Sequence, residues 1–246
     1  MQTTKLLTQS LLTAFGTVWL LLEAYYCLTG TAIDNRLDFW AFVVISLFLG
    51  IAWFLVDGFF FTGDLKRSIE IYSNAFDTPI KIVFSDLFSQ DGWKAISVND
   101  FFDSTVDGSH VSENALHGMM LKNYWGGNTS DWDKQVTEDL ANISPTEDLT
   151  ERPAPGKRSR YPIGTTAKVS TKGHRFLCVA AARTNTDTLQ VSTSFDNLNK
   201  ALRGLLCKAR SVCSGNALNI PLIGSGLGRT GIKPNIIVDI ILLSIF

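Results

Sequence analysis

"NIPLIGSGLGRTGI", residues 219–232, decides the fold, because it places a series of glycines directly after a short apolar run. The run Asn219–Ile223 predicts a buried strand, and the sequence from Ile232 to Phe246 predicts a helix. Glycine adopts positive φ freely and lets the backbone come close to another molecule. Free N–H groups between a strand and a helix N-terminus favour a phosphate. The same pattern is also typical of a tight strand-to-helix turn without a ligand.

Strand and helix patterns alternate through the preceding sequence. Strands are predicted at about 80–84, in "WKAISVN" and on both sides of Lys172–Gly173, and helices in "SENALHGMMLKNYW", at Trp132–Ile143 and from Phe195 to Val212. This order predicts an α/β three-layer domain with a mixed sheet. Residues 144–162, which are rich in proline and in charges of both signs, predict a mobile loop.

Two apolar runs precede this domain, and each is long enough to cross a bilayer. We expect helices at about 6–29 and 38–61, forming a transmembrane hairpin over residues 1–65. A cleaved signal peptide is the competing interpretation of the first run, but no small-residue cleavage site follows it. Lysine and arginine lie outside the hairpin loop more often than in it, which predicts that both termini are cytoplasmic and the protein is multi-pass in the inner membrane.

A connector at residues 66–78 follows the hairpin, and the α/β domain is expected at 79–246. Leu65, Ile69 and Tyr72 have helical spacing, so the second membrane helix is predicted to continue into the cytosol. The formal net charge of −1 argues against nucleic acid as a partner. The three histidines and the cysteines show no metal-binding spacing, so no metal site is expected.

The order of the motifs resembles a known family. "SDLF", "ISVN", "NALHG", "YPIGTTAKV" and "NIPLIGSGLG" follow one another as they do in macro domains, the α/β modules that bind ADP-ribose. The resemblance implies that Asp86, with Leu87 beside it, holds the adenine. It implies that the last glycine loop wraps the diphosphate and that Ser104–Val111 replaces the family's first glycine-rich loop. The ligand-binding residues expected on this basis are Asp86, Leu87, Asn99, His110, Val111, Gly224, Ser225, Gly226, Leu227, Gly228, Arg229 and Thr230.

The chain also departs from the pattern of the family's hydrolases. Asn99 matches the first of their two asparagines, but Phe102 stands where the second would be, and "STVDGSHVSEN" replaces a run of glycines. These changes remove groups that position the distal ribose and the attacking water. The resemblance therefore implies binding without catalysis, no catalytic residues and no cofactor.

A membrane hairpin followed by a macro domain is similar to the membrane-anchored effectors of type II Thoeris anti-phage defence. This resemblance implies that a partner TIR-domain enzyme makes an ADP-ribose-derived signal, with histidine-linked ADP-ribose as the expected conjugate. Binding would drive homo-oligomerisation and membrane disruption, which leads to abortive infection. Two other classes of function stay open: a membrane-tethered ADP-ribosyl hydrolase or reader of ADP-ribosylated proteins, and a structural membrane protein without ligand binding.

Overall fold

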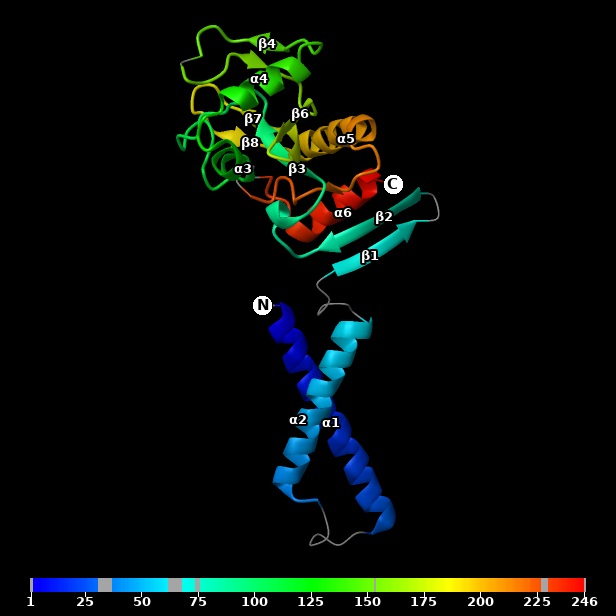
Figure 1. Ribbon diagram of the computed structural model, residues 1–246. Coiled ribbons are helices and arrows are strands. Elements are labelled where there is room, and N and C mark those ends of the chain that lie inside the picture. The colour runs from blue at the N-terminus through cyan, green and yellow to red at the C-terminus, as the bar shows by residue number, and fades with distance from the viewer. Residues whose placement is uncertain are drawn as a thin grey trace. The chain divides into compact units, whose positions relative to one another are not determined.

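The computed structural model describes residues 2–30, 37–61, 68–73, 76–152, 154–226 and 230–245. The chain divides into two compact units, Met1–Ser85 and Asp86–Phe246. Figure 1 colours both units along the chain, from α1 in blue to α6 in red.

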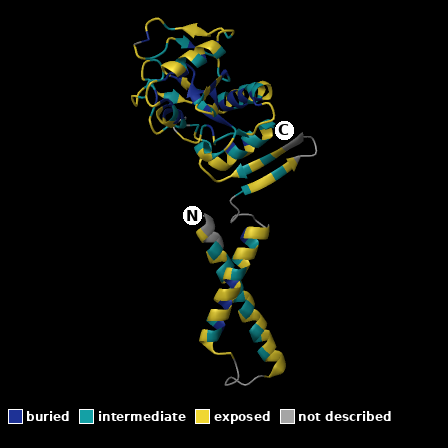
Figure 2. Cartoon of the chain, in the orientation of Figure 1, coloured by how far each residue is buried: buried dark blue, intermediate teal, exposed yellow. Residues whose placement is uncertain are grey.

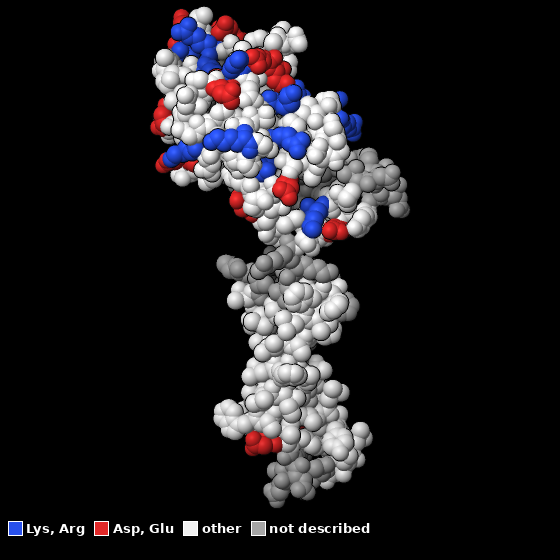
Figure 3. Space-filling model, in the orientation of Figure 1, with Lys and Arg blue, Asp and Glu red and all other residues white. Residues whose placement is uncertain are grey.

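The first unit begins with two long helices. They are α1 (Gln2–Thr29) and α2 (Phe39–Val56), and α2 continues into a π-helical turn, η2 (Asp57–Phe61). Phe42 of α2 is buried between the rings of Phe15 and Trp19 of α1, with ring centroids 4.7 and 5.6 Å away. Over Leu7–Thr29 and Phe39–Phe60 the helices are long and apolar enough to cross a membrane. The face of the hairpin in Figure 3 is almost free of charged side chains.

A two-stranded antiparallel sheet, β1 (Ser68–Ser73) and β2 (Phe76–Val83), completes the first unit. The prediction that the second membrane helix continues through Ile69 and Tyr72 is therefore wrong; Leu65 lies outside the described residues. Isoleucines in β1 also recur at every second residue, and they face isoleucines of β2 in the pairs Ile69↔Ile82 and Ile71↔Ile80. Cross-strand pairing of β-branched side chains outweighs the helical spacing here.

The second unit is built on a mixed sheet. Its strands are β3 (Trp93–Asn99), β6 (Thr166–Thr171), β7 (His174–Thr184), β8 (Val191–Ser192) and β9 (Leu218–Asn219). The order is β6-β7-β3-β9, with β8 paired to the end of β7. β3 is parallel to β7 and β9, whereas β6 is antiparallel to β7. The predicted strand 219–223 pairs with β3 only at its start, and Pro221 has no N–H to extend the ladder.

Helices cover both faces of this sheet, so the predicted three-layer α/β architecture with a mixed sheet is confirmed. The helices are α3 (Leu116–Trp125), α4 (Ser130–Asp139), α5 (Phe195–Val212) and α6 (Pro234–Ile245). Phe176 and Cys178 of β7 belong to the core with α3 and α4, and Leu177 and Val179 belong to the core with α5 and α6. Figure 2 shows these buried residues in the sheet and on the helices that cover it.

Residues 144–162 differ from the mobile loop that their composition predicts. Apart from residue 153, which is not described, the segment carries a short antiparallel pair, β4 (Glu147–Asp148) and β5 (Ser159–Arg160). Arg152 and Arg160 are buried. The segment is therefore attached to the body of the domain by side chains that composition does not reveal. A short 3₁₀ turn, η3 (Leu87–Ser89), precedes β3.

Candidate functional site

The carboxyl ends of the parallel strands lie at one edge of the sheet, and the loops that follow them form the candidate site. They are residues 100–115 after β3, 185–190 after β7 and 220–233 after β9. In open α/β sheets, ligands bind outside the carboxyl ends of the strands. We therefore built the site from these three loops.

A turn closed by side chains follows β3. The Asn99 Oδ1 accepts a hydrogen bond from the Asp103 N–H at 3.0 Å, and the Asn99 Nδ2 donates to the Asp103 Oδ2 at 2.7 Å. Phe102, inside this turn, has φ of 52° and is fully buried. Both polar atoms of the Asn99 amide are thus used to shape the loop.

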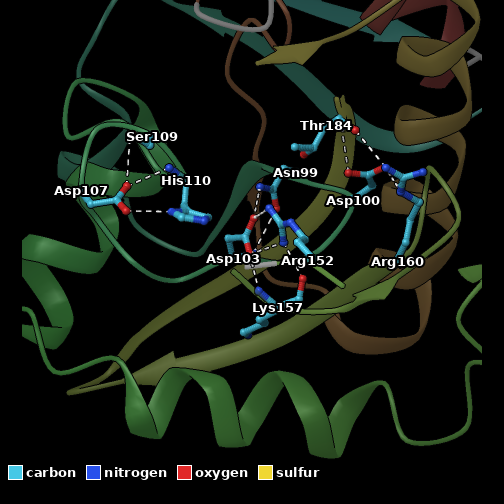
Figure 4. A network of polar contacts seen from close by, with 10 residues as sticks. All are labelled: Asn99, Asp100, Asp103, Asp107, Ser109, His110, Arg152, Lys157, Arg160 and Thr184. Carbon is cyan, nitrogen blue, oxygen red and sulfur yellow. Dashed lines mark hydrogen bonds and ion pairs between the residues drawn. The ribbon is translucent and has the colours of Figure 1, made fainter. Parts of the chain in front are cut away.

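Asp103 is also the centre of a buried ion pair, drawn in Figure 4. Arg152 donates from Nη1 to Oδ1 at 2.8 Å and from Nη2 to Oδ2 at 2.7 Å, and both side chains are 1% exposed. The Lys157 N–H adds a hydrogen bond to Oδ1 at 2.9 Å. Bidentate guanidinium–carboxylate pairs are strong and directional. The pair clamps residues 152–157 onto the loop that follows β3.

A second buried pair lies beside the first. Arg160 contacts the Asp100 carboxylate at 3.2 Å through Nε and donates from Nη2 to the Thr184 carbonyl at 2.9 Å. Burial raises the pKa of Asp100, and a hydrogen bond from the Thr184 N–H and the charge of Arg160 offset part of that rise. The Phe101 ring lies beneath both guanidinium groups, 3.9 Å from Arg152 and 4.8 Å from Arg160. These contacts fix the carboxyl ends of β3 and β7 relative to each other.

The second half of the β3–α3 loop is held by one carboxylate. The Asp107 Oδ1 accepts from the N–H groups of Ser109 and His110 at 2.8 Å each, and Oδ2 lies 2.7 Å from the His110 Nδ1. Partial burial acts to raise the pKa of Asp107, but the hydrogen bonds from His110 and Ser109 outweigh it and leave this pKa lowered. The His110 side chain is 6% exposed, and in the described part of the chain its buried Nε2 has no hydrogen-bond partner.

A pocket of about 390 Å³ lies between this loop and the loop that follows β7. Gly108, Ser109, His110 and Ser112 line one side, and residues 188–191 line the other. No lysine or arginine is among these lining residues. The pocket therefore offers hydroxyl, amide and imidazole groups, but no cationic side chain that would pair with a phosphate.

The glycine loop after β9 has the conformation that its sequence predicts at one position. Gly224 has φ of 87°, and its carbonyl accepts a hydrogen bond from the Thr230 hydroxyl at 2.8 Å. Gly226 is open toward the described part of the chain, where a Cβ atom added to it would meet nothing within 4 Å. The loop leads to Pro234, the first residue of α6, where proline suits a helix start. Leu227, Gly228 and Arg229 lie outside the described residues.

Asp86 and Leu87 do not belong to these three loops, because they lie at the start of η3, before β3. The Asp86 Oδ1 accepts from the Phe88 N–H at 3.2 Å and so caps η3. Partial burial and then the charge of Asp86 raise the pKa of Tyr124. The Tyr124 ring packs 5.7 Å from Phe88 and 4.6 Å from His174, the first residue of β7. Phe88, the residue after Leu87, therefore packs beside Tyr124 near the amino end of β7.

Comparison with known proteins decides the family. Residues 80–246 match the family model described as "Thoeris protein ThsA, Macro domain". The chain belongs to the ThsA macro-domain family. It is also 24% identical over 153 residues to the Thoeris protein ThsA of Bacillus amyloliquefaciens strain Y2, which covers 61% of this chain and 50% of that protein. The chain thus spans about half the length of this curated relative. The resemblance to a macro domain stated from the sequence motifs is confirmed.

Within this ThsA macro domain the structure groups the expected site residues only in part. Asn99, His110 and Val111 come from the loop after β3, and Val111 is 5% exposed and packs in the core rather than in the pocket. Gly224, Ser225, Gly226 and Thr230 belong to the loop after β9. Their roles as ligand contacts stay predictions, as do those of Asp86 and Leu87.

Sequence reasoning missed two sets of residues in the ThsA macro domain. The buried pairs Asp103–Arg152 and Asp100–Arg160 join residues far apart in sequence, and charged residues in a polar stretch give no signal for such pairing. Residues 188–191, the second wall of the pocket, follow a polar turn that the motifs do not mark. Among the residues that the structure describes, no three His, Cys, Asp or Glu side chains are grouped as metal ligands.

Proposed function

We propose that this chain is a membrane effector of bacterial anti-phage defence whose macro domain binds an ADP-ribose-derived nucleotide signal. Its membership of the ThsA macro-domain family supports this function. The observation that carries it is the glycine loop between β9 and α6, with Gly224 at positive φ ahead of a helix N-terminus. Backbone N–H groups in that position suit a diphosphate.

The proposed signal is histidine-linked ADP-ribose, made by a partner TIR-domain enzyme during infection. In this assignment residues 224–230 hold the diphosphate, and Asp86 accepts a hydrogen bond from the adenine amino group. The end of the ligand beyond the diphosphate lies along the loop that carries His110. The pocket beside His110 supports this placement, since it is lined by polar groups and leaves room for a ribose-sized group.

The domain is proposed to bind the signal rather than hydrolyse it. The Asn99 amide is engaged by Asp103, and Phe102 is buried, so neither offers a group to an attacking water. The alternative function is a membrane-tethered ADP-ribosyl hydrolase or a reader of ADP-ribosylated proteins. Hydrolysis of the bound nucleotide by the purified protein would indicate a hydrolase, whereas binding without hydrolysis would indicate a sensor.

The helices α1 and α2 are proposed to span the inner membrane, with both termini cytoplasmic, a connector at 66–78 and the macro domain at 79–246. A ligand drives assembly only if it binds the assembled state more tightly than the dispersed one. We expect the signal to convert small homo-oligomers into larger ones that disrupt the membrane. One hairpin cannot enclose a water-filled path, so several copies are needed.

Calorimetry on the full chain in detergent tests the ligand. The wild-type protein should bind ADP-ribose and its histidine conjugate, and chromatography should recover both intact. Asp86→Ala should weaken binding about ten-fold or more, because a hydrogen bond to a charged group is worth about 1.5–3 kcal/mol. Gly226→Val should abolish binding in a folded protein, since the site has room for a side chain but not for a ligand beside it. Released ADP-ribose would favour the hydrolase instead.

Dye uptake by cells tests the membrane part. Cells that express the chain should become permeable when the signal is supplied, and deletion of residues 1–61 should remove permeability while binding persists. Replacing the hairpin with an unrelated two-helix anchor should also remove it. If the chimera still permeabilised cells, the native hairpin would be only an anchor and this part of the proposal would be rejected.

A further inference from the structure

Arg152 and Lys157 attach their segment to the loop that follows β3. The Asp103 carboxylate holds both the Arg152 guanidinium and the Lys157 N–H, and the Lys157 ammonium pairs with Asp133 of α4. The segment is thereby fixed at both of its ends. Figure 4 shows Arg152 and Lys157 converging on Asp103, with His110 on the adjoining loop.

Gly156 lies in the same segment as Arg152, and it lies close both to the Arg152 side chain and to His110 of the β3–α3 loop. A Cβ atom added to Gly156 would lie 3.0 Å from the Arg152 Cζ and 3.0 Å from the His110 Nε2. Distances of this size are shorter than ordinary van der Waals contact between carbon atoms, which is about 3.5–4.0 Å. A Cβ atom at position 156 therefore requires Arg152 or His110 to shift by a few tenths of an ångström.

The imidazole of His110 is held from two sides. Asp107 holds the Nδ1 side at 2.7 Å, while the Nε2 side has no hydrogen-bond partner among the residues described and lies 3.0 Å from the place that a Cβ atom of residue 156 would take. The ring also lines the pocket between residues 108–112 and 188–191. Arg152, which Asp103 holds, and His110, which lines the pocket, therefore both lie close to position 156.

We propose that Arg152 and Gly156 are positioning residues of the ligand site, which hold His110 at the pocket where the distal ribose of an ADP-ribose-type ligand lies. This inference rests on the proposed function. It assigns a specificity role to Arg152 and Gly156, which lie outside the loops that follow the parallel strands. The segment acts through His110 and does not itself contact the ligand.

The test compares ADP-ribose with ADP, which lacks the distal ribose. Gly156→Ala should displace His110 and weaken ADP-ribose binding about ten-fold, with ADP affinity unchanged. Ala154→Ser is the matched control, because it adds one heavy atom at an exposed position of the same segment and should leave both affinities unchanged. A general loss of structure would lower both affinities together, so the ratio of the two reports positioning.

A double-mutant cycle keeps the test decisive if Gly156→Ala proves poorly folded. In His110→Ala the close contact with the imidazole is gone and only the contact with Arg152 remains, so adding Gly156→Ala should change ADP-ribose affinity less than two-fold further. Residues in contact show such non-additivity, and independent ones do not.

The outcomes separate this inference from the function it rests on. If wild-type protein binds ADP-ribose but Gly156→Ala changes the ADP and ADP-ribose affinities equally, or additively with His110→Ala, the inference is overturned and the proposed function stands. If wild-type protein binds neither nucleotide, the proposed function is overturned and the inference with it.

Discussion

Two of the three loops at the carboxyl edge of the sheet are held in opposite ways. The β3–α3 loop, residues 100–115, is fixed by buried ion pairs that reach to the 144–162 segment. The described part of the β9–α6 loop, residues 220–226 and 230–233, is shaped by the positive φ of Gly224 and by short-range hydrogen bonds from Thr230 and Ser225. We therefore expect the first loop to be preformed and the second to adapt its backbone to a ligand.

This difference teaches how one site can combine selectivity with close backbone contact. A preformed wall rejects a group of the wrong shape, because moving it means disrupting buried charges. A glycine loop has no side chains in the way of a diphosphate and can follow its oxygens. The following substitutions and conditions test whether the two loops differ as described, from the largest expected effect to the smallest.

Arg152→Met should have the largest effect on stability. It leaves the buried Asp103 carboxylate without its guanidinium partner, and breaking a buried pair in this way costs about 3–5 kcal/mol. Urea unfolding of the detergent-solubilised chain measures the change. Arg183→Met is the control, because Arg183 is 57% exposed, 3.9 Å from Glu147, and should change the free energy of unfolding by less than about 1 kcal/mol. If both substitutions lowered the free energy of unfolding equally, the buried pair would not be what fixes the β3–α3 loop, and the distinction between the loops would be lost.

Acidification should weaken the domain through His117, which follows the first loop. Burial lowers the pKa of His117 to about 3, and the charge of Lys157 acts in the same direction. The unfolded chain binds its proton near pH 6.5, so stability is complete above that pH and is lost as the pH falls toward 3. The free energy of unfolding should fall by up to about 1.4 kcal/mol per pH unit below pH 6.

His117→Leu isolates this contribution from that of other groups. The variant should lose less stability than the wild-type protein between pH 6.5 and 5, since leucine binds no proton. Urea unfolding at several pH values measures both proteins. Parallel curves for the two would show that His117 is not the group responsible.

Gly224→Ala tests the second loop. Alanine at φ of 87° is strained by about 1–2 kcal/mol, and its Cβ would lie 2.6 Å from the Thr230 Cγ2. Gly226→Ala is the matched control, because the added methyl group meets none of the described residues within 4 Å. Thermal unfolding should show a clear loss for the first variant and almost none for the second. If Gly224→Ala lowered the stability as much as Arg152→Met does, the β9–α6 loop would be no more adaptable than the β3–α3 loop.

Thr230→Val should have the smallest effect. It removes the hydrogen bond to the Gly224 carbonyl, which is worth about 0.5–1.5 kcal/mol, and keeps the shape of the side chain. Thr230→Ser keeps the hydroxyl and should retain most of the stability. If valine and serine behaved alike in thermal unfolding, the hydrogen bond would not be what closes the loop.

The sequence predicted the parts of the fold that leave a local pattern. The amphipathic helix of residues 195–212 follows from the spacing of Leu198, Leu202 and Leu205, and a positive φ was expected in the glycine loop. Both features arise from residues close together in the chain, so one sequence is enough to predict them.

Features that depend on distant residues were not predictable in this way. Nothing in the composition of residues 144–162 shows that Arg152 pairs with Asp103 rather than with solvent, because the fold alone brings them together. The same holds for Leu189 in the pocket wall. Ile69 fits a helix through its spacing to Tyr72 and a strand through its spacing to Ile71, and only the cross-strand partners Ile82 and Ile80 decide between the two.

The clamp on residues 152–157 has a consequence for proteolysis. By composition this segment is the part of the domain that trypsin would be expected to cut first, since Lys157 and Arg158 lie together in a proline-rich stretch. Yet the Lys157 N–H is bound to Asp103, and its ammonium is bound to Asp133. A protease needs an extended, accessible chain, so cleavage here requires local opening of the clamp. The resistance of the Lys157–Arg158 bond to trypsin in the intact protein therefore reports how rarely Lys157 separates from Asp103 and Asp133.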